Sequence, residues 1–259
     1  MNLQLEDQVV FVAGSSRGIG RAIAAALLDE GARVVLTGRD NASLRQCESE
    51  EVAARGAERV LAICGDFSDA ATIEHAFQAT VKRFGRIDHL VANLGTGSGK
   101  PGWAQSDEEW RRLFELNFFA SVRLTQAVLP YLLQNAAGGS ILYISSIVAL
   151  EATPAPLPYS AAKAALVNYS KNLARQLGSK KIRVNTIAPG NIFFEGGSWE
   201  RHLSTRREQV EQMLKTEVPL ERFGAPEEIA SLAAWLCSSA AGFATGSCFV
   251  VDGGQTRSV

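Results

Sequence analysis

The sequence lacks the patterns that mark several classes of protein. None of its four cysteines (Cys47, Cys64, Cys237 and Cys248) stands at C-x-x-C spacing and its three histidines are far apart, so we expect no metal site. No apolar run reaches the roughly 18–20 residues that span a bilayer. The first residues show no basic stretch followed by an apolar one, as a secretory signal would. Cysteines scattered in this way are typical of a cytoplasmic protein with reduced, mostly buried thiols.

The charge balance gives no reason to expect nucleic acid or an anionic membrane as a partner. Lysine and arginine number 26 against 27 aspartates and glutamates, so the formal net charge is −1. At 259 residues, 46% of them apolar, the chain can bury a large core. It contains no internal repeat, low-complexity tract or linker, so we expect one domain over residues 1–259.

Short apolar runs alternate with helical patterns along the whole chain. Strands are predicted at residues 8–13, 33–37, 60–64, 87–92, 140–145, 182–188 and 248–251. Helices are predicted at residues 18–30, 41–56, near 70–84, 107–135, around Tyr159 to about 178, and 226–239. Strands that alternate with helices in this way are typical of parallel sheets with right-handed crossovers. The sequence therefore predicts an α/β fold, a single-domain Rossmann-type doubly wound parallel sheet of about seven strands with helices on both faces.

Residues typical of helix ends support these ranges. Asn41 is a candidate N-cap for the second helix. Ser106-x-x-Glu109 has the spacing of a capping box ahead of the long helix. Pro226 suits the first position of the last helix, where its missing N–H costs nothing.

The turn after the first strand is rich in glycine. Residues 13–20 read AGSSRGIG, with Gly14, Gly18 and Gly20 at G-x-x-x-G-x-G spacing. Gly14 permits the tight turn, Gly18 lets the backbone approach a pyrophosphate, and Gly20 allows close packing of helix on strand. The free N–H groups of the following helix would then face the phosphates. Glycine alone also suits a structural loop, but its place between a buried strand and a helix favours dinucleotide binding.

Tyr159 and Lys163 stand four residues apart in a predicted helix. Because a helix repeats every 3.6 residues, both side chains share one face, with their polar ends a few ångströms apart. A nearby ammonium favours the phenolate, so we expect the pKa of Tyr159 to lie below its usual value of about 10. Tyr159 would then serve as a general acid or base near neutral pH. Taken alone, the pair is more often an ordinary helical face.

Further motifs follow one another along the chain. They are Gly14-x-x-x-Gly18-x-Gly20, Asp66 in DFSD, Asn117 in ELNFFA, Ser146 thirteen residues before Tyr159, Tyr159-x-x-x-Lys163, Pro189-Gly190 and a terminal VVDGG. Together they resemble the short-chain dehydrogenase/reductase family over essentially the whole chain. The resemblance implies that Ser146, Tyr159 and Lys163 form the catalytic group and that Asn117 completes a proton relay. Ser145 is the neighbouring candidate, but strand alternation points the two serines to opposite sides, and the spacing to Tyr159 favours Ser146.

The resemblance also implies hydride transfer between NAD(P)(H) and a ketone or secondary alcohol. Tyr159 would give its proton to the carbonyl oxygen, and Ser146 would hydrogen-bond that oxygen as negative charge develops on it. The residues implied to bind the cofactor are Gly14, Ser16, Arg17, Gly18, Ile19, Gly20, Arg39, Asp66, Phe67, Asn93, Gly95, Tyr159, Lys163, Pro189, Gly190 and Ile192.

The end of the second strand favours NADP(H) over NAD(H). NAD-binding members of this fold usually carry an acidic residue there, for the ribose 2′-hydroxyl. Here the stretch reads Thr37-Gly38-Arg39, and Arg17 lies in the glycine turn, so two guanidiniums could bind a 2′-phosphate. Asp40 could instead swing towards the ribose or cap the next helix, and Arg17 could be a solvated side chain, so NAD remains possible.

Three stretches depart from the pattern of the family. Leu94 follows Asn93 where members commonly have alanine, beside the cofactor. The glycine-rich stretch at 95–102 is expected to be a flexible loop at the mouth of the site. Phe194 stands where members usually have a threonine that contacts the nicotinamide amide, and phenylalanine cannot make that hydrogen bond.

Residues from about 191 to 223, the lid segment, are expected to cover the substrate. The segment mixes Phe193, Phe194 and Trp199 with arginines and glutamates, and these aromatics could equally anchor the lid itself. The candidate substrates are a 3-oxoacyl thioester, a sugar or polyol, and a steroid-like or other small ketone. Two other functions stay open: an NAD(H)-dependent sugar or polyol dehydrogenase, and a non-catalytic nucleotide-sensing protein on the same fold.

The resemblance implies a homotetramer, because members of the family are commonly tetramers. The predicted helix at 107–135 carries more apolar side chains than one side of a sheet needs: Phe114, Phe118, Phe119, Val122 and Leu129. Symmetric association would bury the surplus, although all of these side chains could also pack inward.

Overall fold

The computed structural model describes residues 3–100 and 102–258 of the chain. Within these residues, seven strands form one parallel sheet in the order β3-β2-β1-β4-β5-β6-β7. The strands are β1 Val9–Ala13, β2 Arg33–Gly38, β3 Val60–Cys64, β4 His89–Ala92, β5 Gly139–Ile144, β6 Ile182–Pro189 and β7 Cys248–Val251. Their order reverses between β1 and β4, so the carboxyl ends of these two strands form the switch point. The predicted fold is confirmed.

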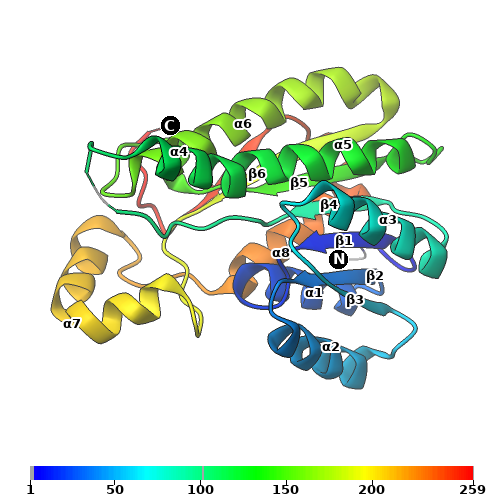
Figure 1. Ribbon diagram of the computed structural model, residues 1–259, viewed down its shortest axis with the longest axis horizontal. Coiled ribbons are helices and arrows are strands. Elements are labelled where there is room, and N and C mark those ends of the chain that lie inside the picture. Colours follow the sequence, from blue (N-terminus) through cyan, green and yellow to red (C-terminus); the bar gives the residue numbers. More distant parts are fainter. Residues whose placement is uncertain (1–2, 101, 259) are drawn as a thin grey trace.

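Helices cover both faces of the sheet (Figure 1). One face carries α1 Gly18–Asp29, α2 Asn41–Arg55 and α8 Pro226–Cys237, and the other carries α3 Ala70–Phe84, α5 Ala120–Leu132 and α6 Leu157–Leu177. Along β1, Val10 and Val12 enter the first core, whereas Val9 and Phe11 enter the second. Because both faces of β1 are buried, its sequence is apolar throughout instead of alternating.

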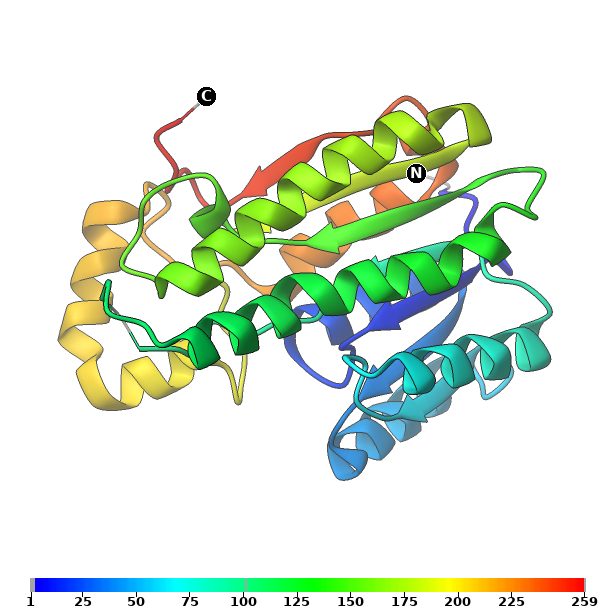
Figure 2. The same cartoon turned by 45° about the horizontal axis from the view of Figure 1, so that its top comes forward.

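The two remaining α-helices of the described residues, α4 and α7, lie towards the carboxyl ends of the strands. Figure 2 shows α4 Asp107–Phe114 running on towards α5, and α7 Ser198–Glu217 lying at the end of the molecule to which the strand arrows point. The backbone of α7 is kinked at Arg206, where φ is −152° and ψ is 47°. Ligands of open α/β sheets bind at this end, so α7 lies beside the expected site.

The N-cap of α2 differs from the prediction. Asp40, one residue before Asn41, caps this helix: its Oδ1 accepts hydrogen bonds from the backbone N of Ser43 at 2.8 Å and from the Ser43 hydroxyl at 2.6 Å. Both bonds hold the pKa of Asp40 below its usual value. Of the two roles considered for Asp40, capping is therefore the one that the structure shows.

The long helix predicted at 107–135 is not continuous. A π-helical turn, Glu115–Phe119, separates α4 from α5, and α5 ends at Leu132. The amide of Ala120 donates to the carbonyl of Glu115, five residues back, which inserts one extra residue into the helix. An extra residue shifts the apolar pattern that follows it by one position, and the predicted range of 107–135 did not take such a shift into account.

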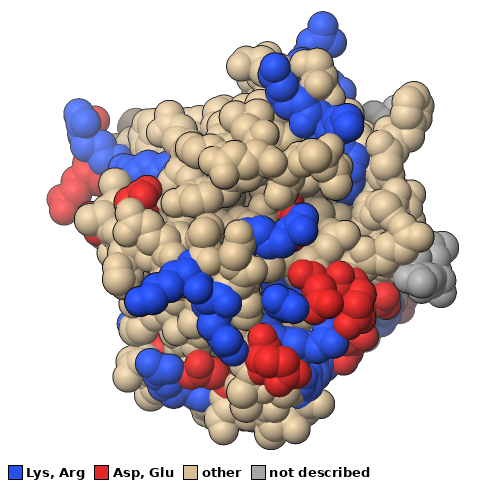
Figure 3. All heavy atoms as spheres, turned by 90° about the vertical axis from the view of Figure 1, so that its right-hand side faces the viewer, with Lys and Arg blue, Asp and Glu red and all other residues tan. Residues whose placement is uncertain are grey.

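The end of the sheet opposite α7 carries charges of both signs. Figure 3 shows basic and acidic side chains intermixed on this side of the molecule. Among the described ion pairs, Arg33–Asp7 at 2.8 Å and Arg59–Glu6 at 2.7 Å join the segment before β1 to the beginnings of β2 and β3. No helix within residues 3–100 and 102–258 is long and apolar enough to cross a bilayer. The four cysteines are free thiols.

Candidate active site

The glycine turn, at the carboxyl end of β1, is held against β2 by the side chains of Thr37 and Ser15. Gly14 has a φ of +74°, and its N–H donates to Thr37 Oγ1 at 2.9 Å. Ser15 Oγ donates to the carbonyl of Val12 and accepts from the N–H of Thr37, each at 2.8 Å. A Cβ on Gly20 would lie only 2.1 Å from the Gly14 carbonyl oxygen, so α1 packs on the turn as only glycine allows.

The residues after β4 pack directly on this turn. Asn93 Nδ2 donates to the Gly14 carbonyl at 2.9 Å. A Cβ on Gly14 would meet the Asn93 carbonyl oxygen at 2.9 Å and Leu94 Cδ2 at 3.4 Å. The leucine at position 94 therefore fills the space beside the glycine turn, at the switch point of the sheet.

Ser145 and Ser146, after β5, have different partners. Ser145 is buried, and its hydroxyl donates to the backbone carbonyl of Lys163 at 3.1 Å. Ser146 is extended, with φ of −170° and ψ of 157°, and its side chain shares a hydrogen bond with Tyr159. Both partners belong to α6, and Ser146 is the serine whose hydroxyl lies beside the phenol.

The pKa of Tyr159 shifts in the direction opposite to the one expected. Burial raises the pKa of the phenol above its usual value, and the hydrogen bond with Ser146 offsets only part of this effect. The expected lowering by Lys163 was wrong, because the lysine ammonium donates to backbone carbonyls and is itself desolvated. Tyr159 is therefore held as the neutral phenol, the form that can donate a proton.

Lys163 lies under the site, on the same helix as Tyr159. Its side chain is buried, and Nζ donates to the carbonyl of Ile144 at 2.8 Å and to that of Leu94 at 3.5 Å. Burial lowers the pKa of this ammonium to about 8. A lysine with this pKa exchanges its proton readily near neutral pH.

Asn117 lies in the π-helical turn and is buried. Its Nδ2 donates to the carbonyl of Leu113 at 2.9 Å and to that of Thr96 at 3.1 Å, and its Oδ1 accepts from the N–H of Thr96 at 3.0 Å. A Cβ on Gly95 would meet both Asn117 Oδ1, at 2.4 Å, and Lys163 Nζ, at 3.1 Å. Residues 95–96 therefore lie between Asn117 and Lys163, held by the amide side chain.

The arginines expected at the adenosine end lie on the rim of the site. Arg17 and Arg39 are both exposed. Hydrogen bonds from Ser68 lower the pKa of Asp66, and the nearby Arg39 guanidinium lowers it further. A Cβ on Gly38 would lie 2.9 Å from Ser16 Cβ, so the end of β2 lies against the glycine turn. These cofactor candidates are gathered at one edge of the switch point.

The side chains of Phe67 and Ile19, two of the cofactor-binding candidates, pack into the cores of the protein. The Phe67 side chain is buried and its ring lies 5.8 Å from that of Phe11, so only the backbone of Phe67 is free to contact a ligand. Ile19 is half-buried and packs against the core that α1 shares with α8. Both positions contribute packing that the sequence motif did not reveal.

The end of β6 leads into the lid segment. A Cβ on Gly190 would lie 2.7 Å from Asp252 Cβ, so the chain after Pro189 passes close to the turn that follows β7. Ile192 is buried and forms an isolated bridge with Gly224. The base of the lid segment is therefore fixed on the sheet.

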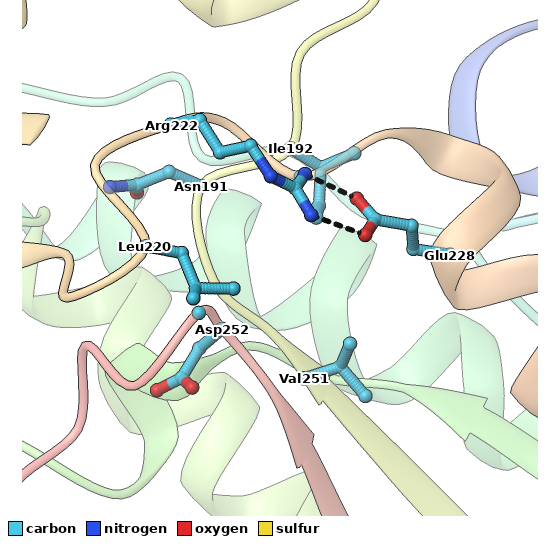
Figure 4. A pocket seen from close by; sticks show the side chains of 9 residues that line it. Asn191, Ile192, Leu220, Arg222, Glu228, Val251 and Asp252 are labelled. Carbon is cyan, nitrogen blue, oxygen red and sulfur yellow. Dashed lines mark hydrogen bonds and ion pairs between the residues drawn. The ribbon is translucent and has the colours of Figure 1, made fainter.

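A cavity of about 110 Å³ lies at this base (Figure 4). Arg222 and Glu228 pair across one side of it, at 2.7 and 2.8 Å, while Leu220 and Val251 give it an apolar wall. The bonds to Arg222 and to the backbone of Ala225 lower the pKa of Glu228 to about 2. The cavity is lined by neither Ser146 nor Tyr159, so we assign it to the packing of the lid base and not to the chemistry.

Among the described residues, no three histidine, cysteine or acidic side chains form a group that could hold a metal ion. The site instead consists of four polar side chains beside the glycine turn: the hydroxyl of Ser146, the phenol of Tyr159, the ammonium of Lys163 and the amide of Asn117. Such an arrangement at the switch point of a parallel sheet defines a class of protein: an oxidoreductase with a Rossmann-type fold.

Comparison with known proteins identifies the family. The family model described as enoyl-(acyl carrier protein) reductase matches residues 13–256. An uncharacterized oxidoreductase of Methylorubrum extorquens is 35% identical over 251 residues, which are 97% of this chain and 98% of the relative. The chain belongs to the short-chain dehydrogenase/reductase family of oxidoreductases.

Two solved structures with ligands are similar over nearly their whole length. One is a 7α-hydroxysteroid dehydrogenase complexed with NADH and 7-oxo glycochenodeoxycholic acid, with a TM-score of 0.90 and 32% identity over 99% of this chain and 97% of that one. The other is the L-sorbose reductase of Gluconobacter frateurii complexed with NADPH and L-sorbose, with a TM-score of 0.92 and 32% identity over 100% of both chains. These relatives support a nicotinamide cofactor, and they differ in which one they hold.

Two residues that shape the site were not found by sequence reasoning. Thr37 anchors the glycine turn and Thr96 is clamped by Asn117. Both lie in stretches that the sequence analysis named, Thr37-Gly38-Arg39 and 95–102, but neither side chain was given a role there. A hydroxyl residue at the end of a strand beside a glycine turn is the signal that would have indicated Thr37.

Proposed function

We propose that the protein transfers hydride between NADP(H) and a ketone or secondary alcohol of a small molecule, with Tyr159 as the general acid or base. The observation that carries this proposal is the hydrogen bond between Ser146 and Tyr159, with Lys163 buried on the same helix. Side chains of these three types, next to a glycine turn, can bind and protonate a carbonyl oxygen.

A bound nicotinamide cofactor would supply or accept the hydride. The glycine turn fits such a group, because Gly14 and Gly18, with φ of +74° and +57°, place no side chain of their own between the backbone and a ligand at the N-terminus of α1. In reduction, Tyr159 gives its proton to the carbonyl oxygen and Ser146 donates a hydrogen bond to that oxygen. Lys163 holds the Ile144 and Leu94 carbonyls beside the site, and Asn117 fixes the backbone of Thr96 next to the ammonium.

NADP(H) is preferred to NAD(H) in this proposal. Arg17 and Arg39 are exposed on the rim where a 2′-phosphate would lie, and the carboxylate of Asp40 is engaged in capping α2. The acidic residue that would favour the ribose 2′-hydroxyl is therefore not available in that role. A guanidinium pair binds a phosphate with charge-assisted hydrogen bonds.

The substrate is proposed to be a small ketone or alcohol that enters under the lid segment. Within this segment Trp199 packs against Phe223, with ring centroids 5.2 Å apart, and Phe193 packs against Phe223 at 5.8 Å. Arg201 and Glu200 lie nearby on α7. We expect a pocket with apolar walls and polar edges, in a chain that forms one domain.

The test is a panel of ketones offered to purified protein with each reduced cofactor. The panel contains a 3-oxoacyl thioester, a keto sugar and an oxo-steroid, and the loss of reduced-nicotinamide absorbance is followed. We expect at least one ketone to be reduced, and faster with NADPH than with NADH. If NADPH binds but no member is reduced, the non-catalytic nucleotide-sensing function is favoured instead.

We also propose a homotetramer. Apolar side chains stay exposed in two regions: Phe119, 45% exposed, where α4 meets α5, and Val250, 41% exposed, on the edge strand β7. Sedimentation equilibrium at micromolar concentration should give about four times the chain mass of 27.8 kDa. A mass near that of one chain would contradict the proposal. The cytoplasmic location expected from the cysteine pattern stays a prediction.

A further inference from the structure

The two ends of the lid segment are hydrogen-bonded to each other, and residues between these ends contact the glycine turn. Phe193 N donates to the Gly224 carbonyl and Gly224 N donates to the Asn191 carbonyl, both at 2.9 Å. These bonds tie the two ends of the segment together beside the sheet. Movement of the segment is therefore confined to the residues that follow Phe193 and precede Gly224.

The ring of Phe194, in the lid segment, contacts the glycine turn. A Cβ on Gly18 would lie 2.8 Å from both Cε2 and Cζ of this ring, and a Cβ on Gly197 would lie 3.2 Å from the same two atoms. The ring therefore sits between two glycines, one from each element. A second contact adjoins it, because Arg17 Nη1 donates to the Gly196 carbonyl at 3.3 Å.

The position of this ring conflicts with the role of Gly18. In a dinucleotide-binding turn, the middle glycine lacks a side chain so that the pyrophosphate can approach the backbone. The space in which a Gly18 Cβ would stand is the space that the Phe194 ring contacts. An apolar ring and a pyrophosphate cannot both lie against the same Cα, and a phenyl ring offers the phosphates no hydrogen bond.

We propose that Phe194 gates the pyrophosphate subsite: its ring must leave Gly18, and the turn at Gly196 must shift with it, before a dinucleotide can bind. The proposal rests on the proposed cofactor, and it assigns to Phe194 a role in cofactor entry. A cofactor that binds only the open form has its apparent affinity reduced by the open fraction. Loss of the ring should therefore speed cofactor association.

The experiment measures binding of NADPH without any ketone. The wild type, Phe194→Ala and Phe194→Thr are mixed with NADPH by stopped flow, and the rise in cofactor fluorescence gives the association rate. Phe193→Ala is the matched control, because that ring is adjacent in sequence but packs on Phe223 within the lid segment. Far-UV circular dichroism checks that each variant is folded.

We expect the wild-type rate to level off as NADPH is raised, since opening of the gate then limits binding. If the closed form is populated a few times more than the open form, both Phe194 variants should associate with NADPH about threefold to tenfold faster than the wild type. Phe193→Ala should associate at the wild-type rate. In the protein alone, amide hydrogen exchange of the peptide that contains Gly18 should be faster in Phe194→Ala than in the wild type and in Phe193→Ala.

Equal association rates in the wild type and both Phe194 variants would overturn the gate. Weaker NADPH binding in both variants, without faster association, would also overturn it, because the ring would then support the bound cofactor. A wild type that binds neither NADPH nor NADH would refute the proposed cofactor and leave the exchange measurement as the test of the Phe194–Gly18 contact.

Discussion

The buried ammonium of Lys163 should make the stability of this protein rise with pH in a way that a single substitution removes. Burial lowers the pKa of Lys163 from 10.5 in the unfolded chain to about 8 in the folded one. Between these two values the unfolded chain binds more protons than the folded chain, so raising the pH through this window favours the folded state. Below about pH 8 both states carry the charge, and the folded state bears the full desolvation cost.

The size of the effect follows from the two pKa values. From about pH 6.5 to about pH 9.5, the free energy of unfolding should rise by about 2 kcal/mol because of Lys163 alone. Lys163→Met removes the titrating group and keeps an unbranched apolar side chain of similar length. The lost bonds to the Ile144 and Leu94 carbonyls cost about 1–3 kcal/mol, but this cost does not vary with pH.

The assay is urea unfolding of the wild type and Lys163→Met across this pH range at equal protein concentration. Other titrating groups are common to both proteins, so they cancel in the difference between the two free energies. That difference should move by about 2 kcal/mol in favour of the wild type as the pH rises. Parallel pH profiles would show that the lysine keeps its ordinary pKa, and the account of a desolvated ammonium would fail.

Two further predictions concern the cofactor end of the site. Arg39→Ala should raise the KM for NADPH about tenfold to a hundredfold relative to that for NADH, as loss of a charge-assisted bond implies, and equal effects on both cofactors would oppose the NADP preference. Gly20→Ala should lower the free energy of unfolding by about 1–3 kcal/mol and weaken NADPH binding, because its Cβ would meet the Gly14 carbonyl oxygen at 2.1 Å. Gly178→Ala is the control: φ is −57° there, no heavy atom lies within 4 Å of the added Cβ, and a gain of about 0.4–1 kcal/mol is expected in thermal or urea unfolding.

The sheet and its switch point could be predicted because their causes are local in sequence. Strands buried on both faces produce apolar runs such as residues 9–13, and the tight turn and close packing at Gly14 and Gly20 require glycine. The choice of Ser146 over Ser145 followed from its spacing of thirteen residues to Tyr159.

What could not be predicted depends on contacts between distant segments or on a single inserted residue. The pKa of Tyr159 rises because the phenol is buried, and the spacing of Tyr159 to Lys163 in the sequence does not show this burial. The π-helical turn around Asn117 changes the helix by one residue. The contact of Phe194 with Gly18 joins positions 176 residues apart, and no periodicity encodes it.

The central claim is that Tyr159 donates the transferred proton. It is tested most directly by Tyr159→Phe, with NADPH binding and single-turnover reduction of an accepted ketone measured on the same sample. The account predicts NADPH binding close to that of the wild type and a reduction rate lower by about a hundredfold to ten-thousandfold, the usual contribution of a general acid. A Tyr159→Phe variant that kept most of the wild-type kcat would contradict the claim.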